Sequence, residues 1–296
     1  MSNSETKNIA ADIGLFYAAA IWGSTFFIVK NALAGIDPVV LVAYRFLTAG
    51  VVLLGYLLYK KKNIFAHLKS SLFLAVILFF LYASQTIGLE YTTASNSGFI
   101  TGLFVFFIPF FQLVLFKVQP TKMEIAACVI SLTGLWILTG GLHDINIGDM
   151  LTLIAAVTYA LHVLYSDKYI RKNYDPLVLS CQQFLMVGVM SLIAALLFNL
   201  PLGIHSVYAL YATLFLALFP TLSAFVIQMY AQKIRTPLRV SLIFALEPVF
   251  AALFAWTLGN EAVVTHRAIG GFLIFLALLL SGIPLDKIRK KRISST

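Results

Sequence analysis

Ten apolar runs of roughly 20 residues each follow one another along this 296-residue chain. A helix of about 20 residues crosses a hydrocarbon core about 30 Å thick, so each run is long enough to span a membrane. With 60% hydrophobic and 11% charged residues, the chain has more apolar surface than one water-soluble core can bury. The runs do not alternate apolar and polar residues, which excludes a transmembrane β-barrel. We therefore predict an all-α, polytopic membrane protein.

The predicted spans are separated by loops too short for a soluble domain, so we expect one compact bundle in the membrane. The polar start of the chain lacks the features of a signal peptide, and we expect the first span to stay in the membrane. The approximate bounds of the spans are 13–33, 38–59, 70–91, 94–116, 123–139, 148–165, 176–198, 207–232, 237–258 and 267–283.

The basic residues indicate how the bundle is oriented. Eighteen of the 21 Lys and Arg residues fall in the two tails and in alternate loops, which lie on one side if ten spans alternate. Because Lys and Arg are concentrated on the cytoplasmic side of membrane proteins, we expect both termini in the cytoplasm. The net charge of +9 then favours contact with anionic lipid, and we predict no nucleic-acid partner because the basic residues are spread over every inner loop.

The two halves of the chain resemble each other. Residues 36–54 and 174–192 share nine residues at a constant offset of 138, beginning with an Asp-Pro pair. At an offset of 137, Asp12 before the first span matches Asp149 at the start of the sixth. Two copies of one unit explain these matches.

We therefore predict two five-helix repeats, residues 1–143 and 144–296. Because five is an odd number, the second repeat enters the membrane from the opposite face, and the two have inverted topology. Such a bundle has two related conformations, each open to one side, with a binding site at the midplane between the halves. The alternative is a duplication that serves only as a stable scaffold.

Several motifs resemble a known family. They are the pair Trp22 and Gly23 in the first span, Arg45 in the second, TTASNSGFITG at 92–102, and LEPVFA at 246–251. With these motifs the whole chain resembles the EamA-type members of the drug/metabolite transporter superfamily. The resemblance implies a bacterial inner-membrane exporter of amino acids, amines or other small metabolites, with relatives that move nucleotide sugars or sugar phosphates. It also implies a central cavity lined by eight spans, with the fifth and tenth at the edge, and it supplies no substrate.

Glu247 and Pro248 interrupt the apolar run FALEPVFAALFAW near the end of the chain. Glu247 lies ten residues into its span, about 15 Å along a helix and therefore near the midplane. Pro248, and Pro109 at the matching place in the other half, lack an N–H group, and each leaves a carbonyl without its helical partner. A bare carbonyl at this depth must face protein or water, so we expect both prolines to border a cavity that also receives Glu247.

Three roles are open for the Glu247 carboxylate. It forms a structural ion pair with Arg45, as charges inside membranes usually do, or it carries a coupling proton, or it binds a cationic group of the substrate. Low-dielectric surroundings disfavour the charged form of a carboxyl group. Our hypothesis is that Glu247 titrates during transport.

Thirteen charged, polar and aromatic side chains are candidates to line the cavity, because an unpaired polar group that faces lipid costs free energy. For each of them, packing between helices or at the membrane interface is the alternative. Since no histidine is spaced from another ligand as a metal site requires, we predict no metal and no other cofactor. The candidates are Trp22, Tyr44, Arg45, Tyr82, Gln85, Asn96, Ser97, Tyr159, His162, Gln182, Gln183, Gln228 and Glu247.

The expected function is secondary transport of a small metabolite by alternating access. One carboxylate, one arginine and several aromatic rings can hold a zwitterionic or cationic molecule such as an amino acid, with protons as a further partner. A nucleotide sugar or sugar phosphate is the alternative, although it would need more cations than Arg45 and Lys30 provide. A channel would need a continuous polar pore. A membrane-embedded enzyme is another rival, but the chain has no zinc, nucleophile-elbow or phosphate-loop motif, and we predict no enzymatic activity.

Overall fold

The computed structural model describes residues 3–140, 145–257 and 265–281, and these residues form helices and no strand. The predicted all-α class is confirmed for this part of the chain. The helices are α1 (Asn3–Ala32), α2 (Pro38–Tyr59), α3 (Leu68–Tyr91), α4 (Ala94–Gly102), α5 (Phe104–Phe116), α6 (Lys122–Thr139), α7 (Ile147–Ile170), α8 (Pro176–Leu197), α9 (Val207–Leu216), the π-helix η1 (Ala217–Ser223), α10 (Ala224–Ala231), α11 (Pro237–Phe244), α12 (Glu247–Thr257) and α13 (Thr265–Ser281).

Seven helices or runs of helices in the described ranges are long and apolar enough to cross a membrane. They are α1, α2, α3, α4 with α5, α7, α8, and the run from α9 to α10. The other three predicted ranges fall on α6, on α11 with α12, and on α13. Helix α1 begins ten residues earlier than predicted. Residue 258 and residues 282–283 of the predicted spans, the repeat boundary at 143–144 and the carboxyl-terminal tail lie outside the described residues.

Two matched Asp-Pro pairs start α2 and α8. The Asp37 carboxylate accepts hydrogen bonds from the backbone N–H of Val39 and Val40, and Asp175 accepts one from Leu177 at 3.0 Å. An N-cap carboxylate satisfies N–H groups that the first turn leaves free, and proline fits that turn because it lacks an N–H. The same local chemistry therefore begins the same helix in each half.

Helices α2 and α8 pack along each other through a reciprocal contact. A Cβ atom added to Gly50 would lie 3.0 Å from the backbone nitrogen of Leu185, and one added to Gly188 would lie 2.8 Å from that of Leu47. Without a side chain, each glycine admits the backbone of the partner helix, as at close helix crossings in membranes. The two contacts are related by the offset of 138 that links the sequences of the two halves.

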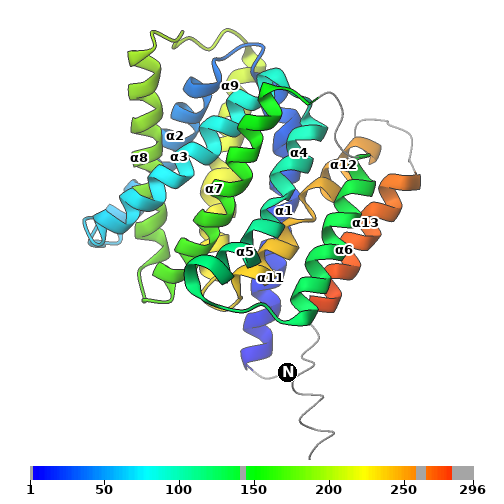
Figure 1. The fold of residues 1–296 in the computed structure, drawn as a ribbon. Helices are drawn as coiled ribbons and strands as arrows, with labels where there is room; N and C mark the ends of the chain where they lie inside the picture. The colour runs from blue at the N-terminus through cyan, green and yellow to red at the C-terminus, as the bar shows by residue number, and fades with distance from the viewer. Residues whose placement is uncertain (1–2, 141–144, 258–264, 282–296) are drawn as a thin grey trace, which may run out of the picture.

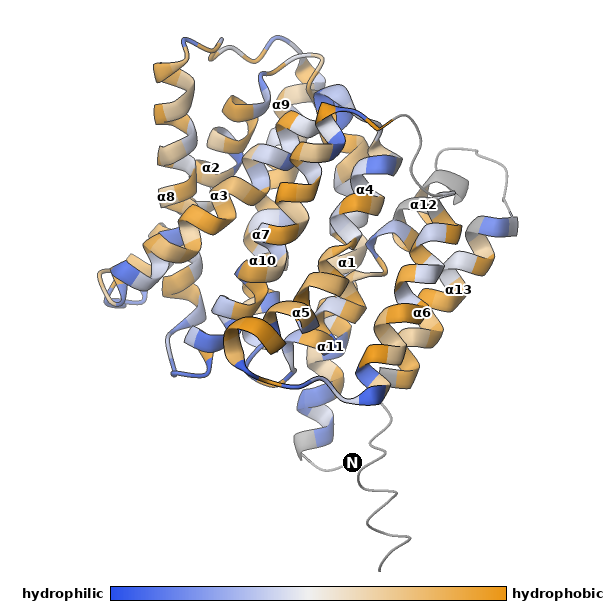
Figure 2. Cartoon of the chain, viewed as in Figure 1, coloured by the Kyte–Doolittle hydropathy of each residue, from blue (hydrophilic) through white to orange (hydrophobic). Residues whose placement is uncertain are grey.

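The other helices pack around α1, α3 and α7. Helix α3 lies along α7, and α1 lies against α10, α11 and α12. Helices α6 and α13 pair with each other at one edge of the bundle (Figure 1). Figure 2 shows hydrophobic residues along the sides of the helices and hydrophilic residues gathered at the two ends of the bundle. This is the distribution expected when lipid surrounds the sides and water meets the ends.

Candidate functional site

A π-helical turn interrupts the run from α9 to α10 in the middle of the bundle. Pro220 lies inside this turn, η1, and has no N–H to donate. The Thr221 hydroxyl donates to the carbonyl of Leu216 at 2.7 Å, and the Pro220 carbonyl accepts a buried hydrogen bond of 2.7 Å from the Trp22 indole. π-Helical turns are frequent at functional sites, so η1 indicates where such a site could lie.

Trp22 lies at the centre of a cluster of aromatic rings. Its ring centroid is 4.7 Å from that of Phe244, 5.2 Å from Phe225 and 6.3 Å from Tyr159, all in edge-to-face geometry. The ring centroid of Tyr82 lies 6.0 Å from that of Phe225. The rings come from α1, α3, α7, α10 and α11, so the two halves of the chain meet in this cluster.

Arg45 borders the aromatic cluster beside Tyr82 and is only 4% exposed. Its guanidinium carbon stands 4.6 Å from the centroid of the Tyr82 ring, and its Nε donates to the Thr221 hydroxyl. The Nη2 atom is buried and has no hydrogen-bond partner among the described residues. A buried cation with an unused donor is costly, which marks Arg45 as a group that can receive an anion.

Glu247 borders the cluster beside Tyr159 and is 5% exposed. Its Oε1 accepts a hydrogen bond of 3.3 Å from the Tyr159 hydroxyl. In the described parts of the chain no ion pair joins it to Arg45 or to any other cation. The structure therefore lacks the ion pair with Arg45, one of the three roles that the sequence leaves open for Glu247, and Arg45 contacts Tyr82 and Thr221 instead.

Two further predicted residues, His162 and Gln183, lie beside the cluster, and a third, Gln228, lies one turn after Phe225 on α10. Gln228 is fully buried, and neither its side-chain oxygen nor its nitrogen has a partner in the described structure. His162 and Gln183 are joined by a hydrogen bond of 2.7 Å, and His162 lies edge-on to Phe225 at 5.9 Å. The unpaired Gln228 amide adds uncharged donor and acceptor capacity to the site.

Other predicted residues lie away from the cluster and hold helices together. The Gln182 amide donates to the carbonyls of Ile64 and Ala66, and Tyr44 donates to the carbonyl of Leu202 at 2.8 Å. Both therefore fix loops to helices. Their polar groups satisfy backbone carbonyls, as the packing alternative requires.

Gln85, Asn96 and Ser97 belong to the contacts of α4. Gln85 donates to Thr101 at 2.9 Å, and Ser97 lies 3.4 Å from the hydroxyl of Thr152 on α7. Asn96 is buried in the first turn of α4, where its backbone N–H is capped by Thr93. These three residues are thus placed where α4 meets α3 and α7 rather than among the clustered rings.

The two predicted helix-breaking prolines differ in their surroundings. Pro248 follows the interruption between α11 and α12, at residues 245–246, which brings Glu247 to the start of α12. Pro109 lies within α5, and the carbonyl of Val105 accepts a hydrogen bond from the Cys128 thiol of α6 at 3.4 Å. The Cys128 thiol thus satisfies the Val105 carbonyl that Pro109 leaves without a helical partner. By contrast, Phe244, just before the interruption that precedes Pro248, packs into the aromatic cluster.

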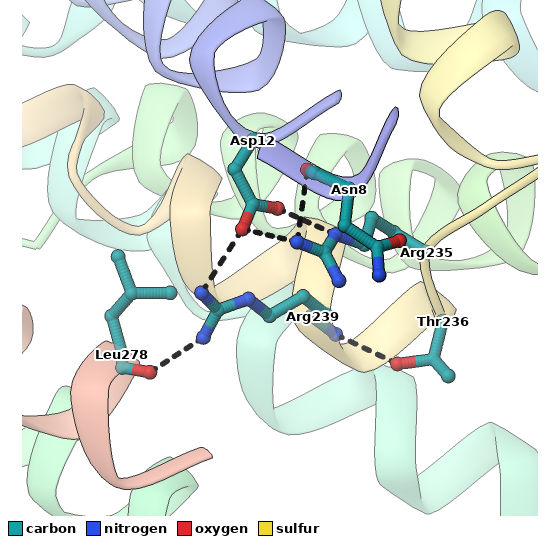
Figure 3. A network of polar contacts seen from close by, with 6 residues as sticks. All are labelled: Asn8, Asp12, Arg235, Thr236, Arg239 and Leu278. Carbon is teal, nitrogen blue, oxygen red and sulfur yellow. Dashed lines mark hydrogen bonds and ion pairs between the residues drawn. The ribbon is translucent and has the colours of Figure 1, made fainter. Parts of the chain in front are cut away.

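One end of the bundle is closed by an ionic network, shown in Figure 3. Asp12 on α1 accepts hydrogen bonds from Arg235 at 2.7 and 2.5 Å and from Arg239 at 3.3 Å. Arg235 also donates to the carbonyl of Asn8, and Arg239 to that of Leu278 on α13. The network therefore ties the amino-terminal end of α1 to α11 and α13.

The opposite end is closed by smaller groups. Asp149, which matches Asp12 in the other half, accepts a buried hydrogen bond of 2.5 Å from Thr92 at the end of α3. Gly88 and Gly148 bring the backbones of α3 and α7 together beside it. Lys30 donates to the carbonyls of Leu89 and Thr92 at 2.5 and 3.0 Å. Lys30 is thus committed to this end of the bundle and does not reach the aromatic cluster as a second cation.

Thr221, Pro220, Phe225 and Phe244 were not singled out by sequence reasoning. Pro220 in the middle of an apolar run was a usable signal for η1, and it would have drawn attention to Thr221. Phe225 and Phe244 gave no such signal, because nothing in the sequence distinguishes them from phenylalanines that face lipid. No group of three His, Cys, Asp or Glu side chains in the described ranges could hold a metal ion.

The chain matches a model of the EamA-like transporter family twice, over residues 9–140 and 146–283. It is 31% identical over 274 residues to an uncharacterized transporter of Archaeoglobus fulgidus, covering 93% of this chain and 86% of the relative. It is 24% identical to the S-adenosylmethionine/S-adenosylhomocysteine transporter of Chlamydia muridarum, with 84% of each chain covered. A crystal structure 19% identical in sequence has the same fold, with a TM-score of 0.80 over 94% of this chain and 98% of the other. The chain belongs to the EamA-like transporter family, a family of multi-pass membrane transporters.

Proposed function

We propose that this protein is a secondary transporter that exports a small zwitterionic or cationic metabolite, of the amino-acid class, across the cytoplasmic membrane by alternating access. The buried and mutually unpaired charges of Arg45 and Glu247, which border one aromatic cluster at Tyr82 and at Tyr159, carry the proposal. Charged side chains inside a membrane usually pair with one another or mark a substrate pathway, and these two do not pair.

The proposed topology has ten spans in two inverted repeats, 1–143 and 144–296, with both termini in the cytoplasm. The seven helices that qualify as spans, together with α6, α11 with α12, and α13, give that number. The reciprocal glycine contacts between α2 and α8 support a two-fold relation between the halves, as do the two separate family matches. The concentration of Lys and Arg on one side supports the orientation.

In this proposal the two closed ends of the bundle act as gates. Asp12 with Arg235 and Arg239 is the gate on the amino-terminal side, and Asp149 with Thr92 is its counterpart on the other side. Asp12 and Asp149 occupy matching positions of the two repeats, so one rocking motion can break one contact while it keeps the other. The cluster is then open first to one side of the membrane and then to the other.

The substrate class follows from the two opposite charges that border the cluster. Arg45, with its unused Nη2, would bind a carboxylate, and Glu247 would bind an ammonium group. Tyr82, Trp22 and the neighbouring rings would hold the side chain and the cation by stacking and cation–π contact. The relative named for S-adenosylmethionine and S-adenosylhomocysteine supports this class, since both compounds contain an amino-acid zwitterion.

A sugar phosphate or nucleotide sugar fits this site less well. Such a substrate carries two negative charges that need several cations, and Lys30 is held by backbone carbonyls at one end of the bundle. Among the described residues of the cluster, Arg45 is therefore the cation that could bind a phosphate group. We further propose that Glu247 exchanges a proton for the cationic group of the substrate, which would couple export to the proton gradient.

The test is counterflow in proteoliposomes with labelled amino acids, amines and sugar phosphates. We expect uptake of at least one zwitterionic or cationic compound, and Arg45→Gln should raise its half-saturation concentration about tenfold or more, because a charged hydrogen bond is lost. The same variant should affect a decarboxylated analogue much less. Glu247→Gln should instead raise the half-saturation concentration of compounds with an ammonium group and should affect analogues that lack this group much less.

Lys172→Gln and Glu124→Gln serve as matched controls. Lys172 is exposed just after α7, and Glu124 caps α6 at the loop end, so neither touches the aromatic cluster or the gates. Both controls should transport as the unmodified protein does. Preferential uptake of sugar phosphates, or equal losses in both controls, would refute the assignment.

A further inference from the structure

A groove of about 490 Å³ opens on the outer surface of the bundle between α2, α8, η1 and α10. Its walls are formed mainly by aliphatic and aromatic side chains, including Leu53, Leu177, Leu222 and Val226. Apart from the two tyrosines at one mouth, the hydroxyl in the wall belongs to Ser223, which already donates to the carbonyl of Phe219 and contacts the hydroxyl of Tyr17 at 2.7 Å. Hydrocarbon therefore fits the groove better than a polar metabolite does.

Two tyrosines and two lysines stand at one mouth of this groove. Tyr56 and Tyr230 line it near the ends of α2 and α10. The ammonium of Lys60 lies 5.9 Å from the centroid of the Tyr56 ring, and that of Lys233 lies 5.5 Å from the Tyr230 ring. Neither lysine forms an ion pair with a carboxylate in the described structure. Cations held over aromatic rings at a membrane interface are well placed to bind a phosphate.

The neighbouring Lys62 is different, because it forms an ion pair of 2.9 Å with Asp175. Partial burial opposes the charge of Asp175, but its bonds to Lys62 and to the backbone N–H groups of Leu177 and Val178 outweigh this, and its pKa lies below the usual value. Asp175 is thus an anion at neutral pH and neutralises Lys62. Positive charge at the mouth then comes from Lys60 and Lys233.

We propose that this groove is a binding site for an anionic phospholipid, with one acyl chain against α2 and α10 and the phosphate between Lys60 and Lys233. The groove follows residues 222–230, about 12 Å along the helix axis, which suits an extended stretch of acyl chain. The lipid would press on Leu222, next to Thr221, which holds Arg45 from the inner side of η1. The site therefore connects the lipid composition of the membrane to the proposed substrate cluster.

The site can be tested on the purified full-length protein by native mass spectrometry with phosphatidylglycerol and phosphatidylcholine of identical acyl chains. We expect the unmodified protein to prefer phosphatidylglycerol. The double variant Lys60→Gln with Lys233→Gln should bind it roughly 30-fold more weakly, about fivefold for each lysine. The control variant Lys69→Gln with Lys172→Gln, at two exposed lysines outside the groove, should retain full binding.

A second pair of variants tests the acyl-chain part of the site. Val52 and Val51 are both exposed on α2, but only Val52 lines the groove. Val52→Trp should reduce the binding of both lipids, whereas Val51→Trp should not. Equal binding of the two lipids by the unmodified protein, equal loss in the two lysine pairs, or full competition by glycerol 3-phosphate would overturn the proposal. Because no transport is measured, these results are independent of the proposed function.

Discussion

Replacing Asp12 with asparagine should loosen the amino-terminal gate while it keeps the size of the side chain. Asp12 has two close bonds to Arg235, and the side chains are 17–20% exposed, so solvent screens them only partly. A charge-assisted hydrogen bond contributes about 1.5–3 kcal/mol and a neutral one about 0.5–1.5, a difference of about 1 kcal/mol for each bond. The substitution should therefore favour the opened gate by about 2 kcal/mol, which is about 30-fold in the equilibrium between the two states.

The shift can be measured as a distance between spin labels at Lys7 on α1 and Ile234 beside α10, both of which are exposed. If about 1% of the unmodified protein has this gate open, about 23% of the Asp12→Asn variant should show the longer distance. Asp175→Asn is the matched control, because it removes the charge of an ion pair on the same side that does not involve α1. An unchanged distance distribution in Asp12→Asn would show that the network does not hold this gate.

Three further predictions concern the other gate, the packing and the coupling. Thr92→Val removes the donor to the buried Asp149 and should open the opposite end, so the spin-label distance on the amino-terminal side should stay short while labels across α3 and α7 move apart. Gly148→Ala should lower the free energy of unfolding by about 1–3 kcal/mol, since its Cβ atom would lie 2.4 Å from a backbone carbonyl, whereas Gly55→Ala, with open space around it, should not destabilise the protein in a thermal unfolding assay. Glu247→Gln should abolish uptake driven by a pH gradient but leave exchange partly intact; unchanged pH dependence would exclude the proton role.

Much of the fold could be predicted because its causes are local. The Asp-Pro pairs fix the starts of α2 and α8 through capping, and both start where the sequence predicted. Trp22, Arg45, Tyr82, Tyr159, Gln228 and Glu247 were all predicted as candidates and lie in or beside one cluster.

The partners of these residues could not be predicted. In a membrane both faces of a helix can be apolar, so the sequence does not indicate which face meets another helix. A pair with Glu247 was one of three roles that the sequence left open, whereas Arg45 is held by Thr221 on η1, whose π-turn depends on long-range packing around Pro220. Gln182 looked like a cavity residue, yet it satisfies loop carbonyls at Ile64 and Ala66, a contact between segments 116 or more residues apart.

The central claim is that one buried site communicates with each side of the membrane in turn. It is tested most directly with a single cysteine at Gln228, in a background in which Cys128 and Cys181 are replaced by alanine. A membrane-impermeant thiol reagent should label this cysteine when added to either side of oriented vesicles. Asp12→Asn should increase labelling from the amino-terminal side, and Thr92→Val should increase it from the other side. Labelling from one side alone in every variant, or labelling only by lipid-soluble reagents, would contradict the account.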